Sequence, residues 1–104
     1  MNLKTLKNYS GMLILLDRLD DRISRTKASG GDNSANQQKR ADLCRCIDEV
    51  ECWINEIPEE STRVIFLLRF ADGMRWKDIA AIIGGGNTED SVKKRCYRYI
   101  KGNG

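Results

Sequence analysis

Residues 76–101 have the sequence WKDIAAIIGGGNTEDSVKKRCYRYIK, and this stretch is the most informative part of the chain. It predicts a short apolar helix, a glycine-marked turn and a second helix. After Asp90 the stretch contains no acid and five cations, which are Lys93, Lys94, Arg95, Arg98 and Lys101. A helix pair with an apolar seam and a basic outer face suits a polyanionic partner, so nucleic acid is the first functional hypothesis.

The net charge of +3 comes entirely from the C-terminal half of the 104-residue chain. Residues 1–58 hold nine Lys/Arg and nine Asp/Glu, whereas residues 59–104 hold nine Lys/Arg and six Asp/Glu. No apolar run approaches the roughly 20 residues that span a bilayer. The apolar patch at residues 13–16 lies too close to charged residues for a signal peptide. We therefore expect a cytoplasmic protein with no membrane partner.

The composition argues against enzymatic chemistry. The chain has no histidine, which is the commonest general base and the commonest zinc ligand. Cys44, Cys46, Cys52 and Cys96 form no CxxC pair, and we interpret them as reduced cysteines that act as small apolar residues. There is also no phosphate-binding loop and no carboxylate pair in a plausible cleft. The sequence predicts no enzyme activity, no metal site and no cofactor.

Residues 1–57 predict two long amphipathic helices, at about residues 3–26 and 37–57, which form an antiparallel hairpin. The connection at about residues 28–36 is rich in glycine, serine and asparagine. Tyr9 and Trp53 are expected in the core of this hairpin. The heptad-like spacing leaves two arrangements open: a hairpin that packs on the rest of the chain, or a homodimer interface through residues 3–57.

Residues 58–104 predict three shorter helices, which complete an all-α fold. The first covers residues 59–71 and has an inner side made of Val64, Leu67, Leu68 and Ala71. The second covers residues 75–83 and ends at a turn of three glycines. Asn87 or Thr88 caps the third, with Asp90 or Ser91 as the reciprocal partner. The last two helices form a helix-turn-helix with the core residues Ile79, Ala80, Ile83, Gly84, Val92 and Cys96.

Residues 57–101 resemble region 4 of the bacterial sigma-70 factors. They are most similar to the small sigma-region-4-like proteins of phages and prophages in Gram-positive bacteria. The matching elements are Ile57-Pro58, Arg69-Phe70, residues 72–74 (DGM), residues 76–80 (WKDIA), the glycine turn, Val92 and the basic tail. In this chain the turn is longer than the common spacing, so Val92 falls two residues late.

The resemblance covers slightly under half of the chain, and it implies a DNA-binding module that acts in transcription. Region 4 in that family recognises a promoter element and also contacts RNA polymerase. Nothing in residues 1–56 looks like the helix that melts promoters. The resemblance therefore implies a phage-type transcriptional regulator rather than a complete sigma factor.

We expect the last helix, at about residues 88–101, to be the recognition helix in the major groove of double-stranded DNA. The predicted base contacts near its start are Ser91, Lys94 and Arg95. The predicted phosphate contacts are Lys93, Arg98 and Lys101 on this helix, and Arg75 and Lys77 at the start of the preceding one. Trp76 is expected at the rim of the motif.

Two alternatives stay open on the sequence alone. A small terminase subunit of a phage, which packages DNA, also joins a helix-turn-helix to a helical oligomerisation segment and would form large rings. A module that binds RNA polymerase or a sigma factor without touching DNA would have the same fold. The pattern also leaves open the DNA target, the sign of regulation and the oligomeric state.

Overall fold

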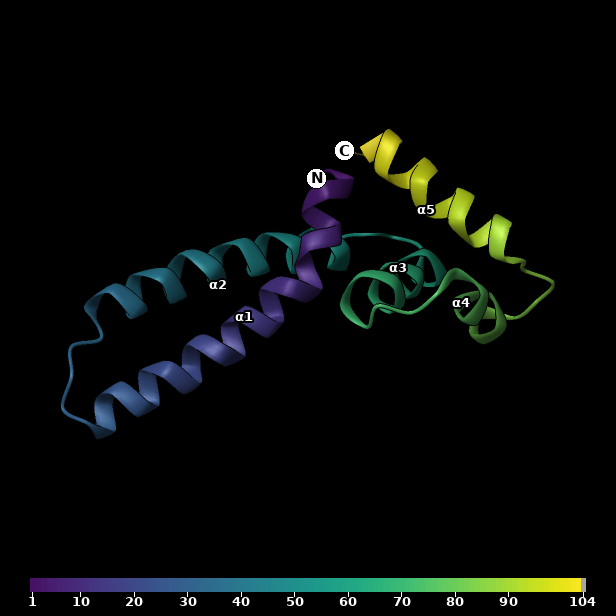
Figure 1. Cartoon of the computed structure of the whole chain (residues 1–104). Coiled ribbons are helices and arrows are strands. Elements are labelled where there is room, and N and C mark those ends of the chain that lie inside the picture. Colours follow the sequence, from purple (N-terminus) through teal and green to yellow (C-terminus); the bar gives the residue numbers. More distant parts are fainter. Residues whose placement is uncertain (104) are drawn as a thin grey trace.

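The computed structural model describes residues 1–103, and all of the regular structure in them is helical (Figure 1). The elements in chain order are α1 (Leu3–Ala28), α2 (Ser34–Asn55), α3 (Glu60–Phe66), a π-helical turn η1 (Leu67–Ala71), α4 (Trp76–Ile83) and α5 (Glu89–Asn103). The predicted all-α class is confirmed. Within the described part of the chain, no helix combines the length and the apolar character needed to cross a membrane.

The α1–α2 hairpin projects from the group formed by α3, α4 and α5, so the molecule is elongated, at 57 × 25 × 19 Å (Figure 1). Its connection is shorter than predicted, because α2 begins at Ser34 rather than at Gln37. The Asp32 carboxylate accepts hydrogen bonds from the backbone N–H (2.9 Å) and the hydroxyl (2.6 Å) of Ser34. Asn33 donates its side-chain amide to the carbonyl of Ile23 (3.0 Å). These local bonds let the second helix start early.

Tyr9 lies in the core at the base of the hairpin, as predicted, with only 4% of its surface exposed. Its hydroxyl donates a hydrogen bond of 2.8 Å to Glu51 on α2. Burial, followed by the hydrogen bond to Glu51 and the charge of Glu51, raises the pKa of Tyr9 to about 12. The base of the hairpin is therefore a packed interface with one satisfied polar group.

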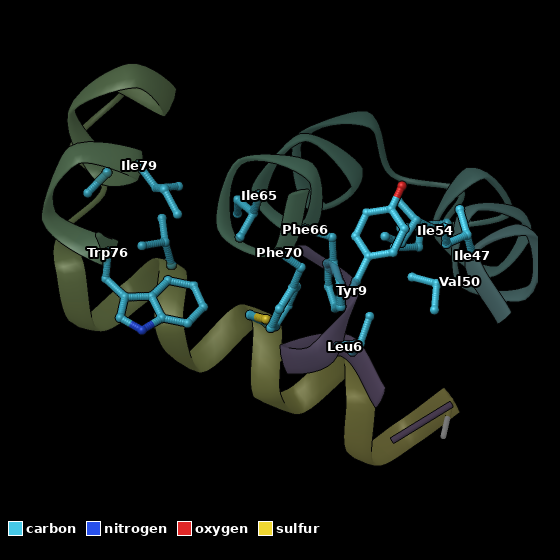
Figure 2. Close-up of a cluster of buried hydrophobic side chains, with 14 residues drawn as sticks. Leu6, Tyr9, Ile47, Val50, Ile54, Ile65, Phe66, Phe70, Trp76 and Ile79 are labelled. Atoms are coloured by element: carbon cyan, nitrogen blue, oxygen red, sulfur yellow. The ribbon is translucent and has the colours of Figure 1, made fainter. Parts of the chain in front are cut away.

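Trp53 does not lie in the hairpin core as predicted, but half-buried where α2 meets α3 and α5. Its ring centroid is 5.3 Å from that of Phe66 and 5.5 Å from that of Tyr99, both in edge-on geometry. Phe66 and Tyr99 are themselves 5.7 Å apart. A single hydrophobic cluster runs from Leu6 on α1 to Cys96 on α5 (Figure 2). The base of the hairpin and the three-helix unit thus share one hydrophobic core, although the sequence divides them between residues 57 and 58.

The inner side predicted for residues 59–71 differs from the buried side in the structure. Of the four predicted residues, one is exposed and three are only partly buried. Leu67 is 39% exposed, and the residues buried in α3 and η1 are instead Thr62, Ile65, Phe66 and Phe70. Val64, Leu68 and Ala71 lie at the margin. Five apolar residues in a row, VIFLL at 64–68, leave the periodicity without a polar position that would mark the outer side. The aromatic rings of α2 and α5 select the side that is buried.

This choice of side predicts a contrast between two residues that lie two positions apart. Ile65→Ala removes a fully buried side chain and should lower the free energy of unfolding by about 2–5 kcal/mol. Leu67→Ala removes a partly exposed one and should cost less than about 1 kcal/mol. Urea denaturation followed by circular dichroism measures both values. If Leu67→Ala lowers the free energy of unfolding as much as Ile65→Ala does, or more, then Leu67 is buried as the sequence predicts.

Candidate nucleic-acid interface

The candidate interface is built on α5, whose inner side is packed against α4. Ile79 and Ala80 on α4 and Val92 and Cys96 on α5 form the seam, and none of them is more than 6% exposed. Ile83, also expected in this seam, is half-buried and packs against the same core. The seam fixes which side of α5 faces the solvent.

The turn between α4 and α5 consists of three consecutive glycines in the left-handed region. Gly84, Gly85 and Gly86 have φ angles of 66°, 62° and 80°. Residues with a Cβ atom rarely adopt this conformation, so the turn requires its glycines. Asn87 closes the turn, because its backbone N–H (3.1 Å) and its side-chain amide (2.8 Å) both donate to the carbonyl of Gly84. The lengthened turn is therefore a defined structure that sets the direction of α5.

Thr88 and Ser91 form a reciprocal capping box at the start of α5. The Thr88 hydroxyl accepts from the backbone N–H of Ser91 (3.1 Å), and the Ser91 hydroxyl accepts from the backbone N–H of Thr88 (2.8 Å). The Ser91 hydroxyl also donates to the carbonyl of Thr88 (2.9 Å). Ser91, a predicted base contact, is exposed, but its hydroxyl already has partners within the cap.

Arg95 does not share the outer side of α5, which corrects the sequence interpretation. Its guanidinium donates to the hydroxyl of Ser61 (3.1 Å) and lies 3.5 Å from the carboxylate of Glu59. Position 95 adjoins the buried Cys96, so it lies at the edge of the inner stripe and points along the protein towards the start of α3. Hydrogen bonds from Ser61 and Thr62, and then the charge of Arg95, lower the pKa of Glu59.

The outer side of α5 carries a row of cations at four- and three-residue spacing. The row consists of Lys94, Arg98 and Lys101, all exposed, with the exposed Lys93 beside it. Lys94 forms an ion pair of 2.9 Å with Asp90 one turn earlier, but both side chains are at least two-thirds exposed, so the pair is weak. Within residues 1–103, Lys93, Arg98 and Lys101 form no ion pair. This row is the strongest positive feature of the helix.

The start of α4 adds two exposed cations: Arg75, which is the N-cap residue of the helix and forms an exposed ion pair of 3.2 Å with Asp78, and Lys77 in the first turn. Trp76 is buried rather than at the rim, with 7% of its surface exposed. The Tyr97 ring lies 5.9 Å from its ring, and the Arg69 guanidinium lies 4.6 Å above it. This stack holds the first turn of α4 beside the middle of α5. No pattern in the sequence indicates this stack, because its members lie far apart in the chain.

The described residues hold no group of three or more His, Cys, Asp or Glu side chains that could bind a metal ion. The four cysteines are free. Only Cys96 is a buried apolar residue as interpreted from the sequence, whereas Cys44 is half-buried and Cys46 and Cys52 are exposed. The four cysteines therefore differ in how far their thiols are exposed to solvent.

Comparisons of the chain with family models, with curated proteins and with solved structures gave no match.

Cys96 provides a probe of the α4–α5 seam. Burial raises the pKa of its thiol to about 12, so the thiol stays protonated and inaccessible in the folded protein. With a thiol reagent at pH 8, Cys46 and Cys52 should react at once and Cys96 only on unfolding, as measured by peptide mass spectrometry. Since the unfolded thiol ionises near pH 9, this group should contribute stability that is lost as the pH rises from about 9 to 12. Fast labelling of Cys96 at pH 8 would contradict the packed seam.

Proposed function

We propose that the protein binds double-stranded DNA through α5 and acts as a transcriptional regulator of the phage or prophage type. The observation that carries this proposal is the row formed by Lys94, Arg98 and Lys101. It lies on the exposed side of a helix whose opposite side is buried against α4. An exposed row of cations on a firmly held helix matches the negative charge that lines a DNA groove.

The dimensions of α5 fit a major groove. An α-helix with its side chains is about 10–12 Å across, and the major groove of B-DNA is about 12 Å wide. With 15 residues, α5 extends for roughly 22 Å at 1.5 Å per residue. The rest of the protein contacts the inner side of α5 and both flanks, through Arg95 on one and Tyr97 on the other, and the outer side with Lys94, Arg98 and Lys101 is open to a duplex.

The geometry favours particular roles for the cations. Lys94 lies nearest the start of the row, where a recognition helix contacts base edges, and its ammonium can donate to guanine O6 and N7. Lys93, Arg98 and Lys101 would contact phosphates, and Arg75 and Lys77 at the start of α4 would contact the neighbouring backbone. Ser91 then caps the start of α5, and Arg95 holds the helix in position through Glu59 and Ser61.

The step from DNA binding to transcription rests on the resemblance of residues 57–101 to sigma region 4. That resemblance also makes RNA polymerase a second candidate partner of the three-helix unit. A selection of bound duplexes from a random DNA pool, at two salt concentrations, tests the whole proposal. An enriched motif supports a regulator, binding without enrichment favours DNA packaging, and no binding favours a module that contacts only protein.

Substitution of the exposed cations tests the interface itself. The triple change Lys93→Ala, Arg98→Ala and Lys101→Ala should weaken binding to all duplexes. It should also reduce the slope of log K against log salt by about 0.9 for each phosphate that the variant no longer neutralises. Fluorescence anisotropy with a labelled duplex measures both quantities. The charge-matched control is Arg22→Ala, Arg25→Ala and Lys27→Ala near the far end of the hairpin, which should leave the slope unchanged.

Lys94→Ala should act differently from the triple change. It should reduce the preference for the selected site by about 1–3 kcal/mol and affect random duplexes much less, because a base contact carries sequence information. The same anisotropy measurement, made with the selected and a random duplex, gives this preference. If neither variant alters DNA affinity, α5 is not the DNA-binding surface.

A further inference from the structure

The outer part of the hairpin consists of two helices with no third element against them (Figure 1). Between residues 10 and 46, Leu19 is the only buried residue, and it is 9% exposed. Leu15 and its neighbour Ile14 are 57% and 58% exposed. Two helices alone can bury only one seam, so much of the apolar surface here is without a partner.

A groove of about 410 Å³ lies between α1 and α2 in this part of the hairpin. Its apolar floor is formed by Leu15 and Leu19 from α1 and Leu43 from α2. Its rim is formed by the cations Arg18, Arg22 and Lys39, and no acid lines it. The groove therefore combines three leucines with a border of three cations.

We propose that this groove binds an acidic amphipathic helix of a different protein. A helix laid between α1 and α2 would place apolar side chains at positions i, i+3 or i+4 and i+7 against the leucine floor. Glu and Asp on the flanks of that helix would meet the three rim cations. The outer hairpin would then become a three-helix assembly with a closed apolar core.

The charges argue against two other occupants. In a symmetric dimer the same patch meets itself, so a second copy of the chain would bring six cations around one apolar floor. A nucleic acid would satisfy the rim, but its phosphate backbone has no apolar surface to cover Leu15 and Leu43. This inference is independent of the proposed DNA contact, because it uses residues of α1 and α2 and none of α5.

The test uses the full chain and a displayed library of random helical peptides. Selection on the immobilised protein should enrich peptides with a helical apolar stripe flanked by Glu and Asp. Enrichment of basic peptides, or no enrichment at all, would overturn the proposal.

Three variants locate the binding of the enriched peptides. Leu15→Glu and the double change Arg18→Glu/Arg22→Glu should each raise the Kd by about tenfold or more, measured by fluorescence anisotropy. Ile14→Glu is the matched control, because Ile14 is equally exposed on the same helix but does not line the groove, and it should change the Kd less than about twofold. Circular dichroism checks that each variant is folded.

Two outcomes would assign the groove differently. Equal effects of Leu15→Glu and Ile14→Glu would show that the peptides bind elsewhere. Sedimentation of the wild-type chain as a dimer that Leu15→Glu converts to a monomer would show that a second copy fills the groove. Either result excludes the acidic partner helix at this place.

Discussion

The packing of three aromatic rings, Trp53, Phe66 and Tyr99, holds the parts of this protein in their relative positions. Each ring comes from a different helix, α2, α3 and α5, and all three pairs lie within 6 Å between centroids. Edge-on aromatic contacts bury large surfaces and constrain the angle between the elements that carry them. One cluster thereby orients the hairpin, the central helix and the candidate DNA-binding helix, and it joins them in a single core.

The function proposed for α5 follows from how completely its other sides are held. The seam to α4 and the contact of Arg95 with Glu59 and Ser61 attach the helix to the protein, and the capping box of Thr88 and Ser91 fixes where the helix begins. From Lys93 to Lys101 every exposed residue of α5 is a cation, and this surface has no apolar strip. A surface of this kind suits a hydrated, negatively charged partner, because burial of these lysines without counter-charges would cost free energy.

The two basic surfaces of the molecule differ in chemistry. The α5 row lies on a polar helix face, whereas the rim cations of the hairpin border three leucines. Charge alone would assign both to phosphate. The apolar floor distinguishes them, since a partner for the hairpin groove must supply apolar side chains as well as negative charge. The elongated shape keeps the two surfaces on separate elements, so each can be tested without disturbing the other.

Local sequence was enough to specify the number and order of the long helices, the glycine turn and the cap of α5, because these depend on hydrogen bonds and dihedral angles within a few residues. It also located the basic helix. It did not specify the early start of α2 or the π-helical turn η1 at the end of α3. Tertiary packing instead determined which side of α3 is buried and where Trp53 and Trp76 lie. It also determined that the Arg95 side chain points towards α3. Each of these depends on partners far along the chain, as in the contact of Arg95 with Ser61, 34 residues away. Periodicity shows that a helix has an inner side, but the elements that pack against it select that side.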